Sequence, residues 1–72
     1  MKPTTTYVLT LPSGMTLVGK STSDSITGAA RTLARKYGQP WHNAYIHVRR
    51  ENDRCLIHHK TTGEFLGTIR DV

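Results

Sequence analysis

Apolar and polar residues alternate in two short segments near the start of the chain. Residues 4–11 carry apolar side chains at every second position from Tyr7 onward, and residues 15–20 repeat this alternation. Between them, Pro12 presets one backbone angle and Gly14 permits a positive φ, as a tight turn requires. A period of two interrupted by a short turn predicts a β-hairpin, preceded by a frayed opening over residues 1–4.

The hydrophobic period changes from two to that of a helix in the next segment. Five apolar residues share the spacing of one buried helical stripe: Ile26, Ala29, Ala30, Leu33 and Tyr37. Asp24 and the serines beside it are suited to cap the first turn, and Asp24 also matches the positive end of the helix dipole. Gly38 and Pro40 are typical of the residues that follow a helix. We therefore predict a helix from Asp24 to Tyr37.

Alternation returns after a loop over residues 39–43. Residues 44–49 and 54–60 are expected to form two strands joined by a four-residue loop, and residues 65–70 a short last strand. The elements then run strand, strand, helix, strand, strand, strand. We expect a single α+β domain over residues 1–72, with one helix packed on an antiparallel sheet of four to five strands.

The faces of the last strands are less regular than those of the first hairpin. Pairing Val48 with Cys55 and Ile46 with Ile57 places Cys55 and Ile57 beside the core. Four apolar residues then remain on the opposite face: Tyr45, Leu56, Phe65 and Ile69. Because a sheet with a helix on one side normally has a polar second face, this set indicates a bulge, a partner surface or a dimer interface.

Positive charge is concentrated in the second half of the chain. The 72 residues include ten Lys and Arg against five Asp and Glu, for a net charge of +5. Seven of the ten basic residues lie between positions 31 and 60: Arg31, Arg35, Lys36, Arg49, Arg50, Arg54 and Lys60. Such an excess attracts nucleic acid, an anionic membrane or an acidic protein surface, and also keeps a small protein in solution.

Aromatic and histidine side chains accompany these basic residues. The guanidinium group of arginine forms paired hydrogen bonds with phosphates and carboxylates. Rings such as those of Tyr45 and His47 stack on bases or fill a partner's pocket. We therefore expect the binding surface to consist of Tyr45, His47 and the seven basic residues. Trp41 lies nearby, either as a further contact or as a plug over the core.

The other reactive side chains do not form a recognisable catalytic or metal site. His58 and His59 are adjacent on an expected strand and so point to opposite faces, and no paired metal-ligand spacing occurs. Cys55 is expected to be a small core residue rather than a nucleophile, since it occupies a core-facing strand position. P-loop and dinucleotide-binding glycine patterns are also lacking. We expect no enzymatic activity, no metal and no cofactor.

The location of the protein is predicted from simple features. A single cysteine excludes an internal disulfide and suits a reducing compartment. The first residues lack the apolar stretch of a secretory signal, and no apolar run approaches the length of a membrane span. We expect a cytoplasmic protein of the host cell interior that does not bind membranes.

The order of elements resembles one family of small proteins. The loop Gly19-Lys20-Ser21-Thr22-Ser23-Asp24 leads from the first hairpin into a helix that contains Ala29 and Ala30, and further strands follow. This layout resembles that of small phage-encoded anti-CRISPR proteins. The resemblance implies an inhibitor that docks on a CRISPR effector complex, and it assigns no individual site residue. A basic chain would contact acidic protein or nucleic acid there rather than mimic DNA.

Three functions follow from these observations. The first is a non-catalytic, phage-type inhibitor or adaptor that docks on a host protein or nucleoprotein complex through its arginine-rich surface. The alternative is a nucleic-acid-binding protein whose same arginines contact phosphates. The third is a structural subunit that forms a homodimer through the apolar outer face of the sheet.

Overall fold

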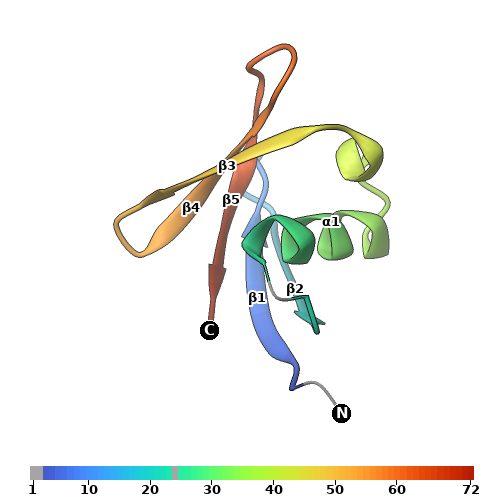
Figure 1. Ribbon diagram of the computed structural model, residues 1–72, viewed down its shortest axis with the longest axis vertical. Helices are drawn as coiled ribbons and strands as arrows, with labels where there is room; N and C mark the ends of the chain where they lie inside the picture. Colours follow the sequence, from blue (N-terminus) through green and yellow to red (C-terminus); the bar gives the residue numbers. More distant parts are fainter. Residues whose placement is uncertain (1–2, 24) are drawn as a thin grey trace.

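All five strands belong to one antiparallel sheet, and one α-helix lies across one of its faces (Figure 1). The computed structural model describes residues 3–23 and 25–72. In chain order the elements are β1 (Thr5–Thr10), β2 (Thr16–Ser21), α1 (Ile26–Lys36), the 3₁₀ helix η1 (Pro40–Asn43), β3 (Ile46–Glu51), β4 (Arg54–His59) and β5 (Phe65–Asp71). The expected α+β fold and element order are confirmed, and the segment expected to be a loop after α1 contains η1.

The strands lie in the order β2-β1-β5-β4-β3, so the last strand is the central one. Ile69 of β5 pairs with Leu9 of β1 on one side and with Cys55 of β4 on the other. β5 therefore joins the two hairpins into one sheet. Since β2 and β3 form opposite edges, the connection through α1 and η1 crosses the whole sheet on one face (Figure 1).

Local interactions set both ends of α1. Ser25 is the N-cap, and its hydroxyl accepts a hydrogen bond of 3.1 Å from the Gly28 amide. Asp24, the expected first residue, lies outside the described residues. Tyr37 is the C-cap and is exposed, so its expected place in the buried stripe is wrong. Its hydroxyl instead donates to the carbonyl of Val18 on the edge strand β2.

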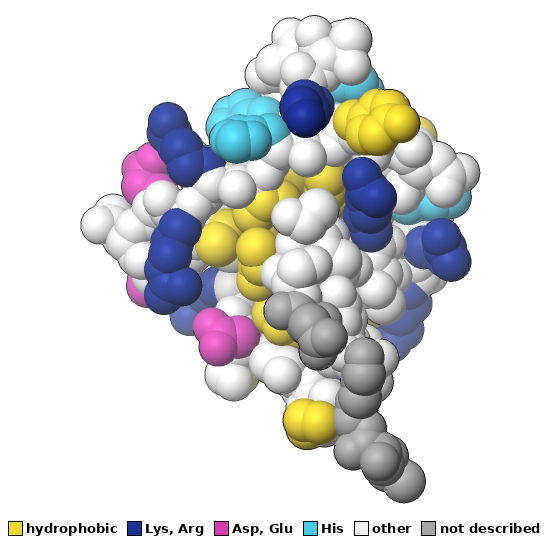
Figure 2. Space-filling view, in the orientation of Figure 1, with side chains coloured by type: hydrophobic (Ala, Val, Ile, Leu, Met, Phe, Trp, Pro, Cys, Tyr) yellow, Lys and Arg dark blue, Asp and Glu magenta, His cyan; other side chains and the backbone are white. Residues whose placement is uncertain are grey.

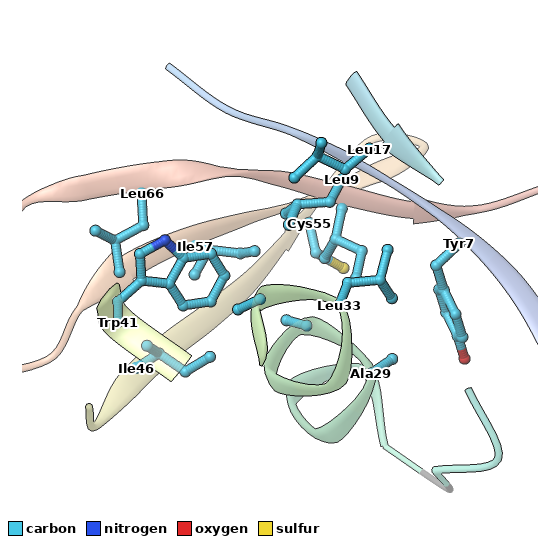
Figure 3. Packing of buried hydrophobic residues seen from close by; sticks show 13 residues of the cluster. Tyr7, Leu9, Leu17, Ala29, Leu33, Trp41, Ile46, Cys55, Ile57 and Leu66 are labelled. Carbon is cyan, nitrogen blue, oxygen red and sulfur yellow. The ribbon is translucent and has the colours of Figure 1, made fainter. Parts of the chain in front are cut away.

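The core lies between α1 and the sheet (Figure 3). Its largest fully buried side chains are Leu9, Leu33, Ile57 and Ile69. Trp41 of η1 is 7% exposed and packs over one end of this core, so it is the expected plug. Cys55 is buried, as expected of a small core residue.

The β3–β4 hairpin is tighter than expected. Val48 pairs with Ile57 and Ile46 with His59, so the expected pairing of Val48 with Cys55 is wrong by two residues. The loop consists of Asn52 and Asp53 rather than four residues, and Asn52 has a φ of 58°. A shift by two residues leaves every side chain on its expected face.

A bulge in β5 changes the faces of the last strand. Ile57 pairs with Gly67 but His58 pairs with Phe65, so Leu66 is an extra residue on β5. Beyond this point the alternation is shifted by one, and Ile69 is 1% exposed in the core. The prediction that Ile69 lies on the outer face is therefore wrong, and the bulge expected as one explanation is present.

The opening segment is described only in part. Residues 1 and 2 of the frayed segment expected over residues 1–4 lie outside the described residues. Pro3 and Thr4 are exposed and precede β1 without regular structure. Near the start of β1, the Thr6 carbonyl accepts a hydrogen bond of 2.9 Å from the Val72 amide.

Candidate functional site

The face of the sheet that points away from α1 is covered by no other described element. Burial alternates along β1, β2 and β4, with the buried residues facing α1 and their neighbours partly or fully exposed. We call these neighbours the outer face: Thr6, Val8, Thr10, Thr16, Val18, Lys20, His47, Arg49, Glu51, Arg54, Leu56, His58, Phe65, Thr68 and Arg70. It combines threonines and small apolar residues with basic and aromatic ones.

Three adjacent strands of the outer face each carry a basic residue. Arg49 comes from β3, Arg54 from β4 and Arg70 from β5. Because Cys55 pairs with Ile69, Arg54 and Arg70 are the next residues on neighbouring strands. Neither forms an ion pair with another described residue. Like charges placed across a strand pair repel each other, and an anion bound between them would remove that repulsion.

Aromatic rings lie at the other end of the same two strands. His58 of β4 pairs with Phe65 of β5, with ring centroids 5.5 Å apart and planes tilted by 55°. His47 of β3 pairs with His58 on its other side, which makes a row of three rings. The distance along β5 from Arg70 to Phe65 is about 15 Å at the usual rise of a strand.

Negative charge on the outer face is small. Glu51 is the sole carboxylate among its described residues, and it lies 3.2 Å from the guanidinium of Arg49. Both side chains of this pair are largely exposed, so the pair adds little stability and can open for another anion. The same face also carries the basic residues Lys20, Arg54 and Arg70, so its net charge is positive.

Three of the expected binding residues lie on α1, on the other side of the sheet. Arg31 donates a hydrogen bond of 3.2 Å to the carbonyl of Ala44 and is partly buried, so it joins α1 to the start of β3. Arg35 and Lys36 occupy the last helical turn, where the helix dipole favours cations. The Lys36 ammonium lies 5.7 Å from the centre of the Tyr37 ring.

The remaining expected residues are divided between two further places. Arg50 lines a groove of about 200 Å³ between α1 and the β3–β4 hairpin, which is also lined by Ile26, Val48, Arg54 and Arg70. Figure 2 shows this side of the molecule, where apolar side chains are exposed between basic and acidic ones. Tyr45 is 75% exposed, and its carbonyl accepts a hydrogen bond of 2.9 Å from the amide of Lys60.

Of the expected set, the structure thus places His47, Arg49 and Arg54 on the outer face and Arg31, Arg35 and Lys36 on α1, whereas Arg50 lines the groove beside α1 together with Arg54. It also adds three residues that the sequence did not assign to binding: His58, Thr68 and Arg70. Leu56 and Phe65 lie on this face as expected for an apolar partner surface or dimer interface. The alternation of β4, which runs from Arg54 through Leu56 to His58 on one face, could have found His58. The places of Thr68 and Arg70 depend on the bulge in β5.

Other kinds of site have little support in the described part of the chain. Within residues 3–23 and 25–72, no three His, Cys, Asp or Glu side chains gather as metal ligands would. No helix in those ranges is both long and apolar enough to cross a membrane. Comparison with protein families, curated proteins and solved structures finds no significant match to this chain. Its function is therefore inferred from the chemistry of its surfaces.

Proposed function

We propose that this protein is a non-catalytic module that binds single-stranded nucleic acid on its outer face. The observation that carries the proposal is the combination on β4 and β5 of adjacent arginines, Arg54 and Arg70, with the ring pair of His58 and Phe65. The guanidinium group of arginine binds phosphates through paired hydrogen bonds, and aromatic rings stack on any of the bases. The chain's net charge of +5 adds long-range attraction.

A single strand fits this arrangement better than a duplex does. The bases of a duplex hide their faces in the stack, whereas those of a single strand can be splayed onto aromatic side chains. A strand that follows β4 and β5 would place phosphates near Arg54 and Arg70 and a base near the His58–Phe65 pair. Leu56 and Thr68 pair between these two ends and provide a smooth, partly apolar surface.

Docking on a host protein or nucleoprotein complex, as an anti-CRISPR-type inhibitor would do, is the second candidate. It is favoured by Tyr45, because an exposed aromatic side chain beside a basic residue, here Lys60, is typical of an interface anchor. Capture of a discrete protein set from host lysate that resists nuclease and is lost on Tyr45→Ala would support this candidate. Capture that nuclease abolishes would support nucleic-acid binding.

The test of the first proposal is the affinity for a fluorescent 12-nucleotide single strand, measured by anisotropy at several salt concentrations. The double variant Arg54→Gln/Arg70→Gln should bind at least about tenfold more weakly. Its slope of log affinity against log salt should fall by about 1.4, the value for two phosphate contacts on a single strand.

The matched control removes the same charge from the helix side. Arg35→Gln/Lys36→Gln also lowers the net charge by two but lies on α1, away from the outer face. This variant should keep nearly all of the affinity. Equal losses in the two double variants would mean that only net charge matters, and no measurable binding by the unaltered protein would refute the proposal.

A further inference from the structure

A pocket of about 480 Å³ opens at the end of the sheet, where η1, the β1–β2 turn and the β4–β5 connection meet. Its walls are mainly apolar and include Pro40, Trp41, Phe65 and Leu66, with His59 and Glu64 among the polar residues. This volume and this mixture are typical of small-molecule sites, in which apolar walls surround a few polar groups that orient the ligand.

The pocket adjoins the outer face through one residue. Phe65 lines the pocket and also forms the ring pair with His58. A strand that runs along β4 and β5 from Arg54 and Arg70 therefore reaches the pocket immediately after the ring pair. The next base of such a strand is the group best placed to enter it.

The polar groups of the pocket are held by the β4–β5 connection. Nδ1 of His59 accepts hydrogen bonds from the amides of Thr61 and Thr62, at 3.2 and 3.3 Å, which assigns the ring proton to Nε2. The Glu64 carbonyl accepts from the His59 amide at 2.8 Å, and the Glu64 amide donates to the Thr62 hydroxyl at 3.2 Å. The residues that line the pocket thus include Glu64, whose carboxylate only accepts, and His59, whose Nε2 is free to donate.

We propose that this pocket receives a guanine base of the bound strand, an inference that rests on the proposed function. Guanine presents two adjacent donors on its Watson–Crick edge, N1–H and the N2 amine, and a carboxylate accepts both. Its O6 accepts from a donor such as Nε2–H of His59. Trp41 and Phe65 line the pocket and provide apolar surface for the base.

The other bases fit this pocket less well. Adenine has an acceptor at N1, which would face the Glu64 carboxylate and leave both groups unpaired. The pyrimidines contact less of the apolar wall because they have a single ring. A base-edge contact of this kind discriminates by about tenfold or more.

Trp41 is the only tryptophan of the chain and lines the pocket, so its fluorescence reports occupancy. We expect guanosine monophosphate to change this fluorescence and to bind at least about tenfold more tightly than adenosine monophosphate. Inosine monophosphate, which lacks the N2 amine, should fall between them. Equal affinities for the guanine and adenine nucleotides would overturn the inference.

Glu64→Gln should remove most of the preference for guanine, and thermal unfolding should be unchanged because Glu64 is exposed. The matched control is Glu51→Gln, which removes the same charge from an exposed residue outside the pocket and should keep the preference. A preference that survives Glu64→Gln would also overturn the inference.

Oligonucleotides separate the failure of this inference from that of the proposed function. A thymine 12-mer and the same strand with one internal guanine should both bind with salt dependence, the second more tightly. Salt-dependent binding of both strands with equal affinity would overturn the guanine inference and leave the proposed function intact. If neither strand bound, the proposed function would fail and the inference with it.

Discussion

Gly67 of β5 lies directly against the carbonyl oxygen of Thr10 on β1. A β-carbon on Gly67 would overlap with this oxygen, and the φ of 135° at Gly67 is one that other residues rarely adopt. The contact occurs beside the bulge, in which Leu66 is the extra residue on β5. Two independent constraints, steric and conformational, thus require glycine at this position.

Gly67→Ala should therefore lower the free energy of unfolding by about 3 kcal/mol or more, from backbone strain together with overlap. Gly63→Ala is the matched control, since Gly63 also has a positive φ, 77°, but an added β-carbon meets nothing within 4 Å. It should cost about 1–2 kcal/mol, the conformational term alone. Urea denaturation measures both, and equal losses would contradict the close approach of β5 to β1.

The same bulge explains what the sequence could not predict about the last strand. Counting by twos from Leu66 places Ile69 on the outer face and Arg70 on the core side. One inserted residue exchanges them, so that Ile69 enters the core and Arg70 joins Arg54. The isolated glycine at position 67 is compatible with a bulge, but it does not locate the extra residue.

Ile69→Ala tests this exchange of faces. Ile69 is 1% exposed between Leu9 and Cys55, so its truncation should cost about 2–5 kcal/mol. Val18→Ala removes atoms from a side chain that is 50% exposed on the outer face and should cost less than about 1 kcal/mol. Similar costs in chemical denaturation would mean that Ile69 does not face the core.

The helix was easier to predict than the binding surface. The buried residues from Ala29 to Leu33 follow the helical period throughout. Gly38, whose φ is 69°, follows the end of the helix. The binding surface depends instead on which layer each cation occupies. Arg35 and Arg49 carry the same charge and belong to the same basic segment of the chain, yet they lie on opposite sides of the sheet. Only the three-dimensional structure shows which of them can belong to the binding surface.

The N-cap of α1 provides a further test of local structure. Ser25→Ala removes the acceptor of the Gly28 amide and should lower the free energy of unfolding by about 1 kcal/mol. Ser25→Asp should keep most of the stability, because a carboxylate can accept the same bond. Ser13→Ala, in the exposed β1–β2 turn, should have almost no effect on thermal unfolding. If Ser25→Ala left the free energy of unfolding unchanged, the cap would not stabilise the helix.

The ring pair on the outer face gives the most direct test of binding. His58→Ala and Phe65→Ala should each weaken binding of a single-stranded 12-mer by about 5- to 150-fold, the range that stacking of about 1–3 kcal/mol per base implies. The two effects should be less than additive if both rings contact the same base. Of these two residues, Phe65 lines the pocket and His58 does not. His58→Ala should therefore leave the fluorescence response to guanosine monophosphate intact.

Phe65 is 42% exposed and His58 partly exposed, so both variants should fold, which thermal unfolding verifies. Met15→Ala is a suitable control, because Met15 is an exposed apolar side chain in the β1–β2 turn outside both the ring pair and the pocket. It should leave the affinity unchanged. If Met15→Ala weakened binding as much as Phe65→Ala, the rings would have no special role, and the arginines would hold the strand by charge alone.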